Sequence, residues 1–306
     1  MSTRKTAVVV AVDGTGRSAG ALRYAAQQAW SSDSQLSIVH VSPDYLPLAS
    51  YLPYLPRDME SEGHAILRDA QDLALALHPE LRVVTDLLTG SRADAVLRSA
   101  AGATLLVVGH ETRVGAERLL TGAVTAKIAA RAQCPVVVVP SAWKPGPATG
   151  RVVLGIKSPS HADELMAEAF DVAAARGAAL VLLHAWGLPD PYADVIEQRT
   201  HADQWVAEGE QMLGRILAEW REAYPDVPVE TRVLHDSPAD ALVAAGDEAD
   251  LVLLVRRARD LLPGHLGGVT RRVLQLSRCP VEILPASSIP LVMPDLVIER
   301  SGRLIT

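Results

Sequence analysis

The sequence has little cysteine and no clustered metal ligands. Only two cysteines occur among 306 residues, and neither belongs to a C-x-x-C pair. We therefore expect no disulfide framework and no redox motif of that kind. The nine histidines form no H-E-x-x-H and no Cys/His cluster with the spacing of metal ligands, so we predict no metal site.

An excess of basic residues is also missing, and so is a long apolar run. Lys and Arg number 29 against 36 Asp and Glu, a formal net charge of −7. This balance gives no basic surface for nucleic acid or for an acidic membrane. No apolar run approaches the roughly 20 residues that cross a bilayer, and the first one meets Asp13 too early for a secretory signal. We expect a cytoplasmic protein that binds neither nucleic acid nor membrane.

Short aliphatic runs are what the chain has in quantity. Hydrophobic residues make up 49% and aromatic residues only 4%, so the core must consist of Val, Leu, Ile and Ala. These runs alternate with Ala-rich helical patterns, which predicts βαβ units around a mainly parallel sheet. Ser18 and Ser91 occupy expected helix N-caps. In the N-terminal part we expect strands at 6–12, 35–41, 81–87, 104–109 and 135–140, and helices at 18–31, 57–78, 91–101 and 122–133.

The chain repeats itself. Asp13 aligns with Lys157 and His40 with His184, both at an offset of 144, and a Cys-Pro pair precedes the last apolar run of each copy. We predict two tandem α/β domains, 1–142 and 150–286, joined around 141–150, with a C-terminal tail at 287–306 outside the repeat. Each copy fits a doubly wound, mainly parallel five-stranded sheet of order 3-2-1-4-5.

In such a sheet a ligand binds outside the carboxyl ends of the strands where the winding reverses, here between strands one and four. The loop after the first strand contains Gly14, Gly16 and Gly20, close to a dinucleotide fingerprint. The second strand, however, has no acid at its end to hold a ribose, and the second copy has no glycine at these three positions. We interpret the glycines as turn residues. Asp13 is the more informative residue, either as a helix N-terminal anion or as an acceptor for sugar hydroxyls.

Three segments together resemble the universal stress protein family. They are "VVVAVDGTGRSAGALRYAAQQA", "LSIVHV" and "LLVVGHETRVGAERLLTGAVTAKIAARAQCPVVVVP". The duplication is similar to that of the tandem members, and the resemblance covers about residues 5–140 and 150–285. It implies an adenine nucleotide α-hydrolase-like fold, a role in surviving stress or dormancy, and pairing of the two domains through their last strands. Glu282 on the second of these strands should then point to solvent or find a partner.

ATP-binding members of the family carry G-x-x-G, nine residues and G-[ST], because glycines let backbone N–H groups approach phosphate. Gly109 and Gly122 match this motif, whereas Thr112 and Ala123 depart from it. Thr125 adds a hydroxyl, and a helix starting near Gly122 would present free N–H groups. The resemblance implies that adenine contacts the backbone near Val41, that the ribose contacts Asp13, and that phosphate lies at residues 108–109 and 122–125. The predicted nucleotide-binding residues are Ala11, Val12, Asp13, Val41, Val108, Gly109, Thr112, Gly122, Ala123, Val124 and Thr125.

The second copy departs further from the motif. Lys157 replaces Asp13, and a lysine cannot accept a hydrogen bond from ribose; Val255 replaces Gly109. We therefore expect ATP, if bound, in the first copy only. The basic loop around 256–272 is either a solvated face or a site for an anion or phosphorylated ligand. Arginines at 256, 257, 259, 271 and 272 make it basic.

No Walker motif, nucleophile elbow or kinase signature is present, so we expect no enzyme beyond weak ATP hydrolysis. Two hypotheses remain. In one, the first copy binds ATP or a related adenine nucleotide as a regulatory ligand. In the other, neither copy binds nucleotide and the protein is an interaction or scaffold module of the stress response, with an unknown protein partner. Whether two chains form a homodimer is open in both.

Overall fold

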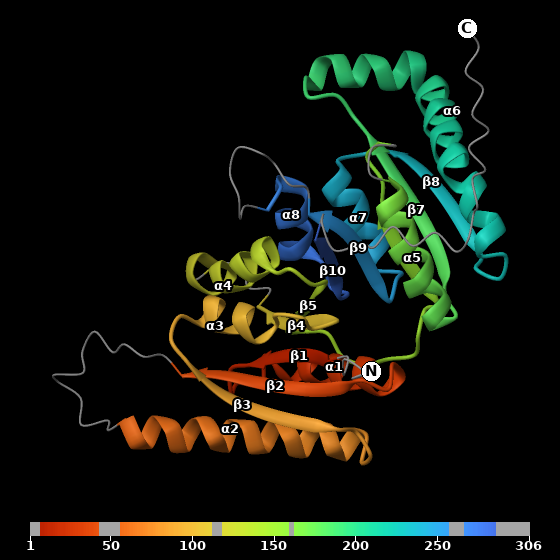
Figure 1. Ribbon diagram of the computed structural model, residues 1–306. Helices are drawn as coiled ribbons and strands as arrows, with labels where there is room; N and C mark the ends of the chain where they lie inside the picture. The colour runs from red at the N-terminus through yellow and green to blue at the C-terminus, as the bar shows by residue number, and fades with distance from the viewer. Residues whose placement is uncertain (1–6, 43–55, 112–117, 159–161, 257–265, 286–306) are drawn as a thin grey trace, which may run out of the picture.

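The computed structural model describes residues 7–42, 56–111, 118–158, 162–256 and 266–285. The predicted tail and Thr112 lie outside these residues. Helices cover both faces of a central sheet (Figure 1). The elements in chain order are β1 (Ala7–Val12), α1 (Ala19–Ser31), β2 (Gln35–Ser42), α2 (Pro56–Leu77), β3 (Val83–Thr89), α3 (Arg92–Ser99), β4 (Leu105–His110), α4 (Arg118–Arg131), β5 (Val136–Pro140), β6 (Arg151–Gly155), α5 (Ala162–Arg176), β7 (Ala179–Trp186), α6 (Pro191–Ala223), β8 (Val229–His235), α7 (Pro238–Gly246), β9 (Leu251–Arg256), α8 (Gly268–Leu276) and β10 (Val281–Pro285).

All ten strands belong to one sheet of order β3-β2-β1-β4-β5-β10-β9-β6-β7-β8. We call β1 to β5 with their helices the first repeat, and β6 to β10 with theirs the second repeat. Each repeat has the predicted order 3-2-1-4-5 with parallel neighbours, and the two join where β5 pairs antiparallel with β10. The mainly parallel doubly wound fold is therefore confirmed, and so is the pairing through the last strands.

The core follows from the aliphatic strands. Strand residues that point to one face join α3, α4, α7 and α8 in a single hydrophobic cluster that crosses the β5–β10 seam. On the other face, α1 and α2 cover one cluster, and α5 and α6 cover another. Inner strands such as β4, β5 and β9 are buried on both sides and almost continuously apolar, whereas the edge strands β3 and β8 are partly exposed and contain polar residues.

The two repeats share details of packing. His40 Nδ1 lies 2.8 Å from the Val12 carbonyl oxygen, and His184 Nδ1 lies 2.9 Å from that of Ile156. These contacts tie the ends of β1 and β2 together, and likewise those of β6 and β7. They place Asp13 and Lys157, the next residues along the chain, at equivalent points of the two repeats.

The seam buries a carboxylate. Glu282 retains only 5% of its exposure, and within the described residues it forms neither a hydrogen bond nor an ion pair. The expectation that it would reach solvent or a partner is therefore wrong. The reason is its register: it lies opposite Val137 at the centre of the β5–β10 pair, beneath the face covered by α1 and α5.

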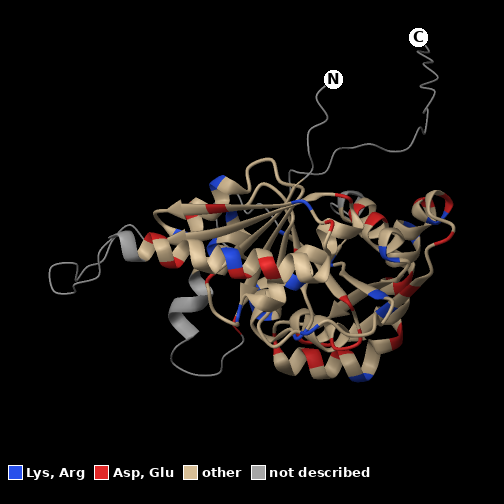
Figure 2. Cartoon of the chain, turned by 90° about the horizontal axis from the view of Figure 1, so that it is seen from below, with Lys and Arg blue, Asp and Glu red and all other residues tan. Residues whose placement is uncertain are grey.

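Charged positions are interspersed along the helices in the view of Figure 2, with blue and red side by side on the same elements. None of the helices in the described ranges is long and apolar enough to cross a bilayer. Cys134 and Cys279 are both buried free thiols.

Candidate functional site

The first repeat has its winding reversal between β1 and β4, because β2 and β3 extend the sheet on one side of this pair and β5 on the other. Ligands of doubly wound sheets bind at the carboxyl ends of the strands at this point. Asp13 directly follows β1, and Gly109 lies near the end of β4. The sheet topology thus brings together the two loops that the sequence singled out.

Asp13 is exposed, and one of its carboxylate oxygens is fixed. Its Oδ1 accepts hydrogen bonds from the Thr15 amide at 2.9 Å, the Thr15 hydroxyl at 2.8 Å and the Ser18 hydroxyl at 3.0 Å. Among the described residues, none donates to Oδ2. The carboxylate is therefore held in one orientation by its own loop, with one oxygen left to accept from a ligand.

Ser18 has a different role from the one predicted. It occupies the N-cap position of α1, but its hydroxyl makes no capping bond to the helix. The hydroxyl lies instead 3.0 Å from Asp13 Oδ1 and 3.1 Å from the Thr15 carbonyl. A capping residue has thereby become a support for the exposed carboxylate.

The three glycines after β1 are not alike, and Gly20 lies in α1, so their interpretation as turn residues is only partly right. Gly14 has φ +76°, and a Cβ there would stand 2.5 Å from Ile66 Cδ1 of α2. A Cβ on Gly20 would stand 3.2 Å from the Trp143 carbonyl, whereas Gly16 faces open space. Gly14 and Gly20 are thus used for packing within the protein.

Ala11, Val12 and Val41 lie at the carboxyl ends of β1 and β2. Val12 and Val41 are buried with 7% exposure each, and Ala11 pairs with Val39 across the two strands. Their side chains belong to the core, so only their backbone groups could meet a ligand.

The predicted phosphate side is built differently from expectation. A Cβ on Gly109 would lie 3.3 Å from the Arg17 carbonyl, so this glycine lets the start of α1 pack on β4. The buried Thr125 donates its hydroxyl hydrogen to the Gly109 carbonyl at 3.3 Å, and contact with phosphate would require that bond to break. Val108 is buried and Val124 partly buried.

The predicted start of a helix near Gly122 is wrong. Helix α4 begins at Arg118, so the amides of Gly122 and Ala123 lie inside the helix and its free N–H groups come earlier. The sequence "RLLTGAVTA" contains Leu, Ala and Arg, which favour helix strongly enough to extend it through Gly122.

Two charged residues of this site were missed by the sequence analysis. Arg17 Nη1 lies 3.2 Å from Glu111 Oε2, and Glu111 retains only 11% side-chain exposure. The pair joins the loop after β1 to the residue after β4, across the winding reversal. Burial lowers the pKa of the adjacent His110 and so favours its neutral form. The only sequence signal was the position of Arg17 and Glu111 in the two loops expected to meet.

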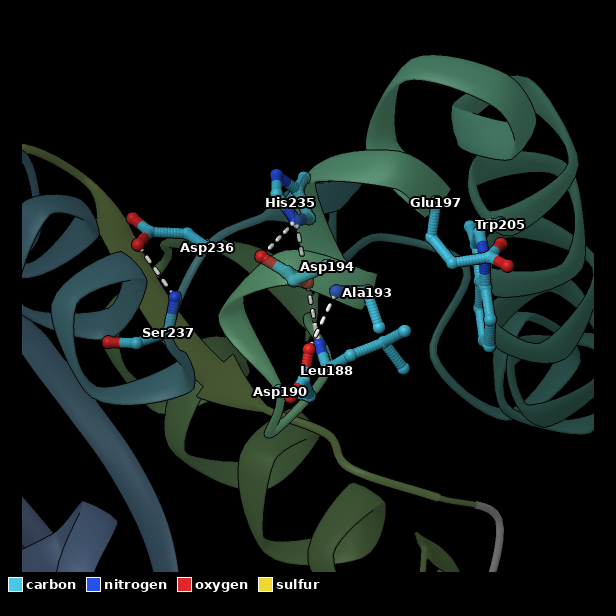
Figure 3. Close-up of polar contacts among 9 residues, drawn as sticks. All are labelled: Leu188, Asp190, Ala193, Asp194, Glu197, Trp205, His235, Asp236 and Ser237. Atoms are coloured by element: carbon cyan, nitrogen blue, oxygen red, sulfur yellow. Dashed lines mark hydrogen bonds and ion pairs between the residues drawn. The ribbon is translucent and has the colours of Figure 1, made fainter.

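In the second repeat, polar contacts join the ends of β7 and β8 to the start of α6 (Figure 3). Asp194, in the first turn of α6, accepts a bond from the Leu188 amide at 2.6 Å and contacts His235 Nε2 at 3.0 Å through Oδ2. The Leu188 amide and His235 hold the pKa of Asp194 below its usual value. Asp190 caps α6 through the Ala193 amide at 2.7 Å. These bonds fasten the start of α6 to the ends of β7 and β8.

Three of the predicted basic residues contact the protein itself. Arg256 donates to the Ala129 carbonyl of the first repeat at 3.1 Å, Arg272 pairs with Asp240 at 2.8 Å, and Arg271 reaches the Leu266 carbonyl at 3.4 Å. Arginines 257 and 259 lie outside the described residues. In the part of the chain described, no group of three His, Cys, Asp or Glu residues could hold a metal ion.

Two doubly wound repeats that share one ten-stranded sheet define a tandem α/β protein. The model of the universal stress protein family matches residues 6–140 and 149–285, and the chain belongs to this family. A universal stress protein of Mycobacterium tuberculosis is 33% identical over 290 residues, which is 90% of this chain and 95% of that protein.

A solved structure supports the fold. The crystal structure of a universal stress protein from Archaeoglobus fulgidus covers 93% of this chain and 100% of its own, with a TM-score of 0.68 and 16% identity. A universal stress protein in complex with cAMP covers 45% of this chain and 98% of its own, at 28% identity and a TM-score of 0.36.

Proposed function

We propose that the first repeat binds ATP or a related adenine nucleotide as a regulatory ligand, and that occupancy alters what the protein contacts during stress adaptation. The observation that carries this proposal is the Asp13 carboxylate. It is exposed at the winding reversal, its Oδ1 is fixed by Thr15 and Ser18, and its Oδ2 has no donor among the described residues. Adjacent ribose hydroxyls are donors suited to such an oxygen.

The other proposed contacts are assigned to the adenine, ribose and phosphate parts of the nucleotide. The backbone at Val41 would meet the adenine, with Ala11 and Val12 beside the ribose. Val108 and Gly109 would line the phosphate path, together with Thr112, Gly122, Ala123, Val124 and Thr125. In the second repeat Lys157 stands at the place of Asp13, and a lysine ammonium cannot accept from ribose hydroxyls. We infer that the second repeat does not bind adenosine in this way.

Calorimetric titration with ATP and with adenosine tests the proposal. We expect saturable heat for the wild-type protein and a tenfold to hundredfold weaker affinity, roughly, for Asp13→Ala, because a charged hydrogen-bond acceptor is lost. Lys157→Ala is the matched control and should bind ATP as the wild type does. No heat at millimolar ATP would refute nucleotide binding, and an unchanged Asp13→Ala would refute the assigned site.

A second candidate is an interaction module that needs no nucleotide. Its support is an apolar stripe at the start of α6, where Tyr192, Val195 and Ile196 are 78%, 44% and 42% exposed and spaced to share one helix face. Absence of nucleotide binding in the titration above would favour this candidate.

A further inference from the structure

The first part of α6, residues 191–200, is a short helical segment that contributes nothing to the core. We call it the α6 arm. It ends at a kink, where His201 has the non-helical backbone angles φ −132° and ψ 16°. Figure 1 shows the arm at the top of the molecule, turned away from the rest of α6. The buried residues of α6 all follow the kink; they are Gly209, Leu213, Leu217 and Trp220.

Charged side chains, and no apolar ones, attach the arm to the protein. Asp194 accepts from the Leu188 amide at 2.6 Å and contacts His235. Glu197, three residues on, accepts a hydrogen bond from Trp205 Nε1 at 3.1 Å (Figure 3). Trp205 in turn stacks on Trp186 at the end of β7, with 5.4 Å between the ring centroids. Residues three apart share a helix face, so the side of the arm that meets the protein is its acidic side.

The apolar side of the arm faces outward instead. Tyr192, Val195 and Ile196 have the i, i+3, i+4 spacing of one helix face, and all three are exposed. A helix on a protein surface normally turns such a face to the core and its charged face to water. In the described ranges, three of the nine exposed large hydrophobic residues lie within these five positions. Scattered exposed apolar residues are ordinary, whereas a cluster of them marks an interaction surface.

The chain's own tail, residues 286–306, starts on the same rim of the sheet as the arm. Strands β10, β9, β6 and β7 are parallel neighbours, so β10 ends at Pro285 on the rim where β7 ends and α6 begins. Three strand spacings separate β10 from β7, which is about 14 Å. The tail contains the apolar run Leu-Val-Ile at 296–298, which begins 11 residues after Pro285. A chain of that length reaches up to about 36 Å, enough to bring the run to the arm.

We propose that the apolar run at 296–298 packs on Tyr192, Val195 and Ile196, so that the tail covers the outer face of the α6 arm. Three aliphatic side chains of the tail then leave water together with three of the arm. A segment tethered to the same molecule is present at an effective concentration of the order of millimolar, which favours it over a second copy or a separate protein. Another protein can reach this face only when the tail leaves it.

Thiol crosslinking in the full-length protein tests the contact. Ile196→Cys and Val297→Cys are combined in one chain and treated with a short bismaleimide, while the native Cys134 and Cys279 are buried. We expect a crosslink within one chain, identified by peptide mass spectrometry. The matched control pairs Val297→Cys with Glu210→Cys, an exposed position of α6 beyond the kink, and should react at least about fivefold more slowly. Equal rates for the two pairs, or crosslinks only between two chains, would overturn the proposal.

Hydrogen exchange measures the same contact without an added thiol. Replacing all three residues 296–298 with serine should speed exchange of the 191–200 amides about tenfold, with exchange at 212–222 unchanged. The substituted residues lie beyond both repeats, which end at residue 285, so the fold should be kept. Unchanged exchange in the arm would refute the docking, and protection that rises with protein concentration would assign the face to a second copy. Neither measurement involves nucleotide, so its result is independent of ATP binding by the first repeat.

Discussion

Glu282 of β10 lies directly opposite Val137 of β5, and the repeat makes these two residues counterparts at an offset of 145. The seam therefore places one carboxylate beside its own pseudo-twofold axis. Burial, and then the nearby Glu168, raise the pKa of Glu282 to about 7, and Arg176 opposes this shift. Tyr24, whose pKa burial also raises, adjoins the same cluster from α1.

Replacing Glu282 with Val should make the stability of the protein less dependent on pH. The folded state keeps the Glu282 proton up to about pH 7, whereas the unfolded state loses it near the ordinary value of 4.5. Wild-type stability should therefore fall as pH rises from 4.5 to 7, by about 3 kcal/mol for this group. Glu282→Val should be the more stable protein above pH 7, and this advantage should shrink toward pH 4.5. Urea unfolding of both proteins across this range measures the difference, and a constant difference would contradict the assignment.

Gly14→Ala should destabilise the protein by about 1 to 3 kcal/mol, because an alanine at φ +76° is strained and its Cβ would collide with Ile66. Gly16→Ala, two residues on, faces open space and is the matched control, with an expected change within about 0.5 kcal/mol. Thermal and denaturant unfolding compare the two variants. Equal effects would show that the turn does not require a glycine at position 14.

Tyr24 and Arg176 join the two repeats on the face opposite the shared core. The Arg176 guanidinium donates to the Tyr24 hydroxyl at 2.6 Å and to Gln28 Oε1 at 3.1 Å. A double-mutant cycle with Tyr24→Phe and Arg176→Met should give a coupling energy of about 1 kcal/mol. Unfolding free energies of the four proteins measure it, and additive effects would mean that this contact contributes nothing to the seam.

Glu111→Gln should strengthen binding of ATP relative to adenosine. Glu111 places a carboxylate on the predicted phosphate side and holds Arg17 at 3.2 Å. Neutralising it removes a repulsion and leaves Arg17 to pair with phosphate, so we expect a gain of about threefold to tenfold for ATP and none for adenosine. Parallel titrations measure both. A gain for adenosine as well would place the effect outside the phosphate contacts.

The sequence predicted much of the fold because its signal is local and is repeated. Most strands are short aliphatic runs that alternate with helical patterns, which predicted the doubly wound strand order, and the family resemblance implied the seam between β5 and β10. Asp13 was found because it directly follows an apolar strand at the predicted winding reversal, whereas its supporting donors Thr15 and Ser18 were not predicted.

Long-range relationships could not be predicted in this way. Arg176 and Tyr24 are separated by 152 residues, and nothing in either neighbourhood marks the other. The burial of Glu282 depends on a strand register that apolar runs alone do not fix. Helix α4 begins at Arg118 because helix propensity outweighed the break suggested by Gly122. The contact between Asp194 and His235 at the start of α6 joins residues 41 apart, and no pattern in the second copy indicated it.

The antiparallel seam orients the two repeats in opposite directions. Strands β1 to β4 run in the opposite direction to β6 to β9, because β5 and β10 pair antiparallel. The loops after β1 and those after β6 therefore open on opposite rims of the sheet. Ligands bound at the two rims would be separated by the length of the strands, so any coupling between them would have to pass through the protein.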